Sequence, residues 1–197
     1  MGRPKTYQRD DVTRKAMDLF WTQGFEATST KDLAGEMGIN SYSLFAEFES
    51  KQGLYEAALD LYRRDVVTKV FGSLLQPDAG LETVLELLDL FAARAGASNA
   101  TRGCFACNVA TERAASDSVS HDYFATHIEY INKAICNALR NSKAKGQLQA
   151  KVSCEKQSKL LVATLLGFSV LMRAGTDAMF IVSAVREARS GLEALRV

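Results

Sequence analysis

Hydrophobic residues recur every three or four positions along almost the whole chain, which is the spacing of amphipathic helices. A sustained alternation of hydrophobic and polar residues, the pattern of a half-buried strand, does not occur. Only two prolines are present, Pro4 and Pro77, so long stretches contain no helix breaker. The pattern predicts an all-α fold of about nine helices.

Glycines and capping residues mark the ends of the first predicted helices. The first covers residues 10–23 and is stopped by Gly24. Ser29 can cap the second, because Asp32 three residues later completes a capping box. Gly38 ends this second helix after about two turns.

The third predicted helix covers residues 41–48, because Asn40 is a natural N-cap. Ser50 caps a fourth helix that runs to about residue 71. The run QPDAG, residues 76–80, is the clearest break in the chain. The remaining helices are expected over residues 81–95, 104–115, 121–140, 154–173 and 177–195.

Composition places the chain among cytoplasmic proteins. Its 197 residues, 47% of them hydrophobic, can bury a core without metal or disulfide cross-links. The four cysteines do not form a disulfide framework, so we expect reduced thiols. No secretory signal is visible, and the longest apolar run, residues 160–172, is shorter than the about 20 residues that span a bilayer. We expect no membrane partner.

Two short helices joined by the turn Gly38-Ile39-Asn40 indicate a helix-turn-helix motif. Leu44 and Phe48 are four residues apart and face inward. The outward or sideways positions are left to Ser41, Tyr42, Phe45 and Ala46. Such a helix can enter the DNA major groove. Alternatively, Tyr42 and Phe45 fill the core of a helical protein, and the net charge of +1 does not point to nucleic acid.

The N-terminal quarter of the chain closely resembles the DNA-binding domain of TetR/AcrR-type transcriptional regulators. The matching motifs are Gly-Ile-Asn, Leu-Phe-x-x-Phe and Ser-Lys-x-x-Leu, in that order. The resemblance implies a helix-turn-helix domain over residues 6–66, with its motif at about residues 29–48. It also implies a ligand-binding and dimerisation domain over residues 67–197.

The resemblance implies three groups of DNA contacts. The base edges would be contacted by Ser41, Tyr42 and Ala46. The sugar-phosphate backbone would be contacted by Thr30, Ser43, Phe45 and Lys51. A basic N-terminal arm would carry Arg3 and Lys5 to the minor groove or to flanking phosphates.

The recognition segment also departs from the family pattern. Tyr42 stands where many members carry a small residue, and Phe45 replaces the usual tyrosine. Glu47 and Glu49 bring negative charge near the DNA backbone. Few cations are involved, so we expect a shallow dependence of DNA affinity on salt for each subunit.

The resemblance further implies a homodimer, a double-stranded DNA operator and a small-molecule inducer of unknown identity. Family members usually pair through their last two helices. The helix over residues 154–173 is apolar nearly all round, and Gly167 and Ser169 permit close helix approach. This helix could instead be the central helix of a monomer. The middle helices should enclose the inducer, and no cofactor is expected.

Cys104 and Cys107 are one helical turn apart at a helix N-terminus, where a thiolate is stabilised. They could be small core residues, a redox or electrophile sensor, or part of a copper or zinc site. A metal site would need further ligands, which only folding could supply, from His121, His127, Cys136 or Cys154.

Candidate inducer contacts lie on the middle helices and are Phe105, Asn108, Glu112, His127 and Phe168. The two phenylalanines could equally be plain core residues. Asn108 and Glu112, four residues apart, could face a polar ligand or be solvated.

Enzyme motifs do not occur: we find no phosphate loop, dinucleotide fingerprint, metalloprotease motif or nucleophile elbow. We therefore expect no catalytic residue and a DNA-binding regulator, usually a repressor in this family. A cysteine-dependent enzyme using His127 and a helical protein-interaction module are the alternatives.

Overall fold

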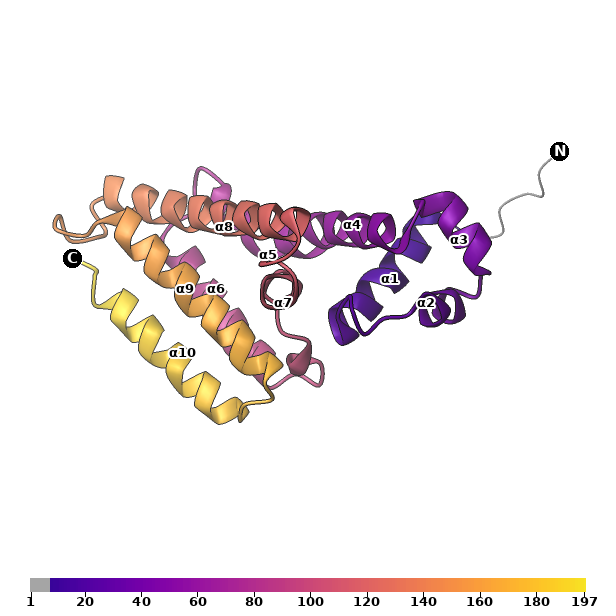
Figure 1. The fold of residues 1–197 in the computed structure, drawn as a ribbon. Coiled ribbons are helices and arrows are strands. Elements are labelled where there is room, and N and C mark those ends of the chain that lie inside the picture. The colour runs from indigo at the N-terminus through magenta and orange to yellow at the C-terminus, as the bar shows by residue number, and fades with distance from the viewer. Residues whose placement is uncertain (1–7) are drawn as a thin grey trace. The chain divides into compact units, whose positions relative to one another are not determined.

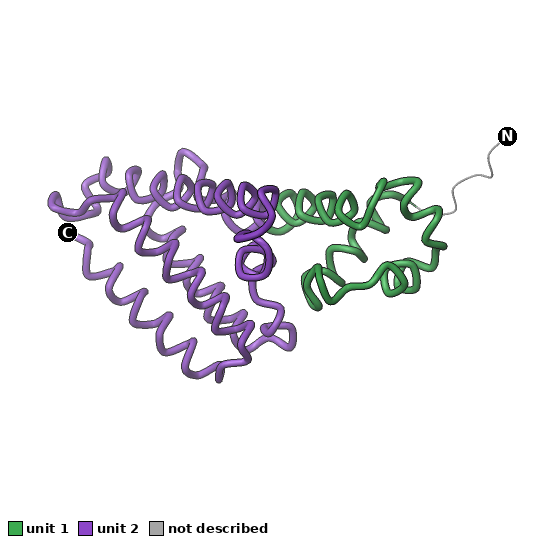
Figure 2. Tube along the Cα trace, viewed as in Figure 1, with its two compact units in different colours: residues 1–66 green, residues 67–197 purple. Residues whose placement is uncertain are grey.

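The structure is a computed structural model that describes residues 8–197. Within this range the chain is built from helices and turns, with one isolated bridge between Leu148 and Arg196. The predicted all-α fold is confirmed. The chain divides into two compact units, Met1–Val66 and Val67–Val197 (Figure 2).

The first unit contains four helices in the described part of the chain (Figure 1). They are α1 (Arg9–Gln23), α2 (Thr30–Met37), α3 (Ser41–Phe48) and α4 (Lys51–Tyr62). Helices α1 and α4 pack along each other, with the ring centroid of Phe20 5.2 Å from that of Tyr55. The Trp21 and Tyr62 rings meet edge to face at 4.9 Å. These aromatic contacts between α1 and α4 form an aromatic platform in the core of the first unit.

Local capping explains where the short helices begin and end. The Ser29 hydroxyl accepts from the Asp32 backbone N–H at 3.1 Å, and the Asp32 carboxylate accepts from the Ser29 N–H at 2.9 Å. Gly38 ends α2 in the left-handed conformation, with φ of 68°. The Asn40 side chain then accepts from the Ser43 N–H at 2.8 Å and starts α3. The predicted caps are confirmed.

The predicted fourth helix, to about residue 71, is not regular. After α4 the chain forms a π-helical turn, η1 (Arg63–Val67), and then the short α5 (Thr68–Phe71) and the 3-10 segment η2 (Gly72–Leu75). Hydrophobic spacing cannot distinguish one wider turn from a regular one, because both bury the same side of the helix. The boundary between the two units falls inside η1.

The second unit contains the larger helices α6 (Leu81–Ala95), α7 (Phe105–Glu112), α8 (Ser118–Ala144), α9 (Cys154–Arg173) and α10 (Ala178–Glu193), with a short 3-10 turn, η3 (Ala100–Arg102). Helices α8 and α9 pack along each other, and α10 packs against α6 and α9 (Figure 1). No helix within residues 8–197 is long and apolar enough to cross a membrane.

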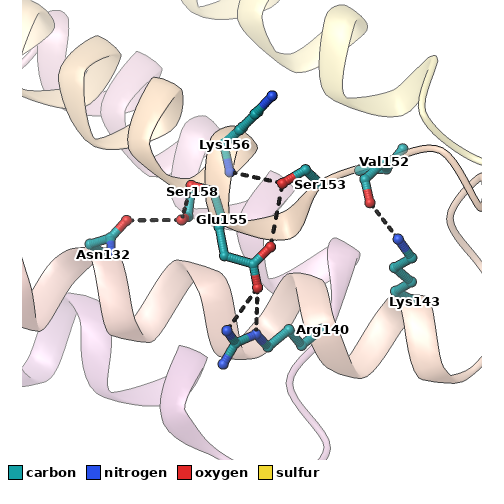
Figure 3. A network of polar contacts seen from close by, with 8 residues as sticks. All are labelled: Asn132, Arg140, Lys143, Val152, Ser153, Glu155, Lys156 and Ser158. Atoms are coloured by element: carbon teal, nitrogen blue, oxygen red, sulfur yellow. Dashed lines mark hydrogen bonds and ion pairs between the residues drawn. The ribbon is translucent and has the colours of Figure 1, made fainter.

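Polar contacts join α8 to the start of α9 (Figure 3). Arg140 donates from Nη2 and Nε to Glu155 Oε1 at 2.7 and 3.1 Å. Two helical turns earlier along α8, Asn132 accepts from the hydroxyl of the buried Ser158 at 2.8 Å. The contacts fix the register of the two helices against each other.

Candidate nucleic-acid interface and thiol cluster

Helix α3 displays one face and buries the other. Leu44 and Phe48 lie in the core of the first unit, whereas Ser41 and Ala46 are exposed. The Tyr42 side chain is the most open of these, with 85% of its surface accessible. The alternative in which Tyr42 fills the core is therefore wrong, and the helix offers a free aromatic ring to a partner.

The corner after α3 is unusually tight. Glu49 has φ of 64° and ψ of −43°, and the Ser50 N–H donates to the Phe48 carbonyl at 2.7 Å, which forms a γ-turn. The same carbonyl would lie 2.2 Å from a Cβ at position 53, so only glycine fits there. This role of Gly53 was not predicted from the sequence, where its only signal is a glycine in the first turn of a helix.

The negative charge of Glu47 is paired. Its side chain is only 12% exposed, and its Oε1 lies 3.2 Å from Nε of Arg9 at the start of α1. The Arg9 guanidinium also lies over the Phe48 ring, 4.8 Å from its centroid. The expected negative charge near DNA is therefore compensated at Glu47, while Glu49 remains exposed.

The remaining candidate DNA contacts that the structure describes lie on α2, α3 and α4. Thr30 is exposed at the first position of α2, and Ser43 and Phe45 are half-buried on α3. The Lys51 ammonium lies 4.1 Å from the centroid of the Phe25 ring, an arrangement that sequence spacing did not indicate. Arg3 and Lys5 lie outside the described residues.

In the second unit, folding brings His127 to the cysteine motif. Nε2 of the buried His127 on α8 lies 3.8 Å from Sγ of Cys104, the residue that precedes α7. A hydrogen bond with Cys104, and then burial, raise the pKa of the Cys107 thiol. Cys107 therefore keeps its proton, and Cys104 is the thiol that has a base beside it.

A glycine positions this cluster against α9. Gly103 has φ of 60°, and a Cβ at this position would lie 2.8 Å from the Ser169 carbonyl of α9. The Asn108 amide donates to the Arg102 carbonyl at 3.2 Å and closes the same loop. The backbone before Cys104 is thus in direct contact with α9.

The other candidate inducer residues are dispersed. Phe105 and Phe168 are buried in the core, and Glu112 is exposed. His121 is exposed and pairs with its neighbour Asp122 at 3.1 Å. Within residues 8–197, no group of three or more histidine, cysteine or acidic side chains is arranged to hold a metal ion.

Helices α9 and α10 carry a row of exposed apolar side chains. The large ones are Leu160, Val170, Met179 and Phe180. Ala163 and Gly167 are exposed between them on α9, which permits another helix to approach closely. An apolar surface of this kind marks a protein contact.

A displayed second helix after a glycine turn, in a chain with a larger helical unit, defines a helix-turn-helix DNA-binding protein. Residues 12–58 match the family described as bacterial regulatory proteins, tetR family, and residues 80–188 match the tetracyclin repressor-like C-terminal domain. The chain belongs to the TetR family of transcriptional regulators.

Individual relatives agree with this assignment. The chain is 30% identical over 179 residues to the HTH-type transcriptional repressor ComR of Escherichia coli (strain K12), covering 89% of this chain and 84% of ComR. A cysteine-substituted form of the TetR family regulator CifR, solved with a 26-base-pair operator, has a TM-score of 0.84 and 28% identity, covering 96% of this chain and 98% of CifR. A TetR regulator from Chloroflexus aurantiacus, at 22% identity, has a TM-score of 0.85 over 95% of each chain and shows the same fold.

Membership of this family makes the protein a ligand-responsive, DNA-binding regulator, and regulators of the family are dimeric. The relatives named here are regulators and not enzymes.

Proposed function

We propose that this protein is a dimeric repressor that binds a palindromic operator through α3 and releases it when an inducer acts on the second unit. The observation that carries the proposal is the exposed Tyr42 ring on a helix anchored by the buried Leu44 and Phe48. A free aromatic side chain is costly in water but suits contacts with thymine methyl groups and sugars. The repressor name of ComR supports repression, and the operator complex of CifR supports binding to double-stranded operator DNA.

The proposed contacts fall into two sets. Ser41, Tyr42 and Ala46 share the exposed side of α3 and would meet base edges. Backbone contacts are proposed for the residues around that side, Thr30, Ser43, Phe45 and Lys51, and the arm residues Arg3 and Lys5 would reach the minor groove or flanking phosphates.

The test is selection of duplexes from a random pool by the wild-type protein, followed by titration of the Tyr42→Ala variant. Loss of one good base contact should weaken binding to the selected duplex by about 10- to 100-fold. Tyr130→Ala, which truncates a half-buried tyrosine on α8, is the matched control and should bind as wild type. Failure of the wild type to enrich any duplex would favour a protein-interaction module and would overturn the proposal.

The dimer is proposed to form through the apolar face of α9 and α10. Two copies related by a two-fold axis would present two α3 helices about 34 Å apart, one turn of DNA. Since DNA is the partner, we place the protein in the cytoplasm. No reaction is proposed for it, and the Cys104–His127 pair is assigned to sensing instead of turnover.

The inducer signal is proposed to be oxidation of the thiols of Cys104 and Cys107, at the start of α7. His127 Nε2, 3.8 Å away, would accept the Cys104 proton as the sulfur attacks a peroxide. The peroxide bond breaks, one oxygen becomes part of a Cys104 sulfenic acid, and the other leaves with the proton, as water from hydrogen peroxide or as an alcohol from an organic peroxide. The Cys107 sulfur would then displace the sulfenic hydroxyl, which leaves as water with the Cys107 proton, to form a disulfide.

This thiol proposal is tested with hydrogen peroxide on the protein bound to its selected duplex. We expect release of the duplex and a mass loss of about 2 Da, both abolished in Cys104→Ser. Cys154→Ser, at a buried thiol on α9, is the control and should respond as wild type. Equal release from Cys104→Ser and wild type would leave the thiols as core residues.

A further inference from the structure

We infer that two residues of α8, Asn137 and Asn141, fasten the segment that follows the first unit and thereby set the spacing of the two α3 helices in the dimer. We call them the asparagine pair. This inference rests on the proposed DNA-binding function and on the proposed dimer. It adds positioning residues that lie outside the helix-turn-helix and outside the thiol cluster.

The segment over residues 67–80, the linking segment, joins the first unit to α6. It contains α5, η2 and the run QPDAG, and Leu74 within it is fully buried. The last carbonyl groups of a helical segment have no intrahelical partner, and Pro77 has no N–H to donate back to the preceding turn. Such carbonyl groups are satisfied by water or by side chains, and here α8 supplies side-chain donors.

The asparagine pair donates to the linking segment at successive points. The Asn137 amide donates to the Leu74 carbonyl at 2.8 Å and to the Gln76 carbonyl at 3.3 Å. The Asn141 amide, one helical turn later on α8, donates to the Ala79 carbonyl at 3.0 Å. Both asparagines are half-buried, so water competes less for these hydrogen bonds than it would on an open surface. The pair therefore attaches the end of η2 and the loop after it to α8.

Ser142, the neighbour of Asn141, attaches the far end of the linking segment. Its buried hydroxyl accepts from the Leu81 N–H at 2.6 Å and so caps α6, whose N-cap residue Gly80 has no side chain to do this. A Cβ at position 80 would lie 2.9 Å from the same hydroxyl. The linking segment is thus held to α8 at the end of η2, in the loop and at the start of α6.

This attachment matters for DNA binding because the linking segment is the covalent connection between α3 in the first unit and α9 and α10 in the second. In a dimer, the second α3 has a high effective concentration over the second half-site only while the connection limits its range. A looser connection should therefore weaken binding to a palindrome without changing the contacts of either α3 with its own half-site.

Helix α8 also provides a matched control. Asn132 uses its side-chain oxygen, which accepts from the Ser158 hydroxyl of α9 at 2.8 Å (Figure 3). Aspartate at position 132 keeps this acceptor. Aspartate at position 137 instead loses the donor and turns a carboxylate oxygen toward the Leu74 carbonyl. Asn137→Asp and Asn132→Asp thus make the same change of charge on the same helix, with opposite effects on hydrogen bonding.

The experiment titrates each variant with the duplex selected by the wild-type protein, with its single half-site, and with duplexes whose half-sites are moved apart by one or two base pairs. We expect Asn137→Asp to bind the selected palindrome about tenfold more weakly than wild type and to bind the half-site equally well. Its affinity should also fall less when the half-sites are moved apart, because a looser connection tolerates a wrong spacing. Asn132→Asp should match wild type in all three measurements.

Sedimentation and thermal midpoints are measured alongside, and Asn137→Asp should remain a folded dimer. If it is unfolded at the assay temperature, Asn137→Ala takes its place, because alanine removes the donor without adding a charge. Asn132→Ala is then the control.

The outcomes separate this inference from the proposed function. If Asn137→Asp binds the palindrome as tightly as Asn132→Asp does, or loses affinity for the half-site as well, the asparagine pair does not set the spacing and the DNA-binding function stands. An unchanged response to spacing, or loss of the dimer, would also overturn the inference. If the wild type binds the palindrome no better than the half-site, the proposed dimer falls with it. If the wild type enriches no duplex, the proposed function and the inference fall together.

Discussion

Gly53 shows how one residue determines whether α3 can end where it does. The Phe48 carbonyl, which closes the γ-turn at Glu49, occupies the space that any Cβ at position 53 would need. The last turn of α3 and the first turn of α4 are therefore in direct backbone contact at Phe48 and Gly53. A larger side chain at this position must move one of them.

We expect Gly53→Ala to destabilise the first unit by more than about 2 kcal/mol, because a contact of 2.2 Å with backbone cannot be relieved by a side-chain movement. Urea unfolding followed by Trp21 fluorescence measures this, since that ring lies in the aromatic platform. Gly35→Ala on α2 is the control: its Cβ would meet nothing within 4 Å, so it should stabilise by about 0.5–1 kcal/mol. A Gly53→Ala protein as stable as wild type would mean that the corner relaxes.

Single residues were predictable from sequence where their role is local. Ser29, Gly38 and Asn40 act on backbone groups within four residues, so the sequence itself contains both partners. Arg9 and Glu47 are 38 positions apart, and only the packing of α1 against the other helices brings them together. Cys104 and His127, also far apart in sequence, meet for the same reason.

At the scale of elements, helix bounds were predicted correctly where the hydrophobic spacing is strong. They were predicted wrongly where a polar run separates two helices. The expected bounds of α6 and α9 match the structure. Residues 116–120 were expected to lie between two helices, but Asp117 among them is the N-cap of α8 and accepts from the Ser120 N–H at 2.9 Å. Aspartate and serine suit a helix start as well as a loop, so composition alone could not decide.

The contact between α8 and α9 should be sensitive to acid. The hydrogen bond from Arg140 lowers the pKa of Glu155 from its usual 4.5. The pair therefore stabilises the fold above the usual pKa, and this contribution is lost as the pH falls through the lowered value. We expect the difference in thermal midpoint between wild type and Glu155→Gln to be largest near neutral pH and to vanish in acid.

The control for this experiment is Glu129→Gln, which changes the same charge at an exposed position of α8. At neutral pH its thermal midpoint should differ less from that of the wild type than the midpoint of Glu155→Gln does. Salt should also reduce the Glu155 effect, since both partners are largely exposed. A difference that persists at low pH would mean that Glu155 acts through its packing and not its charge.

On the scale of the whole molecule, the exposed apolar row of α9 and α10 is not covered by any other part of the protomer that the structure describes. The sequence of α9 is apolar nearly all round, and in the protomer Leu160 and Val170 on this helix remain exposed. A second copy covering this row would account for both observations, because the apolar composition then serves an interface between subunits.

We expect Val170→Glu to separate the dimer while leaving each protomer folded, because the side chain is 48% exposed in the protomer and a buried unpaired carboxylate is costly at an interface. Val119→Glu, at a valine 41% exposed on α8, introduces the same charge outside the row on α9 and α10 and should remain dimeric. Sedimentation measures the mass and circular dichroism the helix content.

The same variant connects assembly to DNA binding. A dimer holds its second α3 at a high effective concentration over the second half-site, so a monomer loses that advantage without losing any DNA contact of its own. Val170→Glu should therefore bind a full palindrome about as weakly as wild type binds a single half-site. Val119→Glu should still bind the full palindrome more tightly than the half-site. If monomeric Val170→Glu still bound the palindrome like wild type, the two copies of α3 would not be acting together.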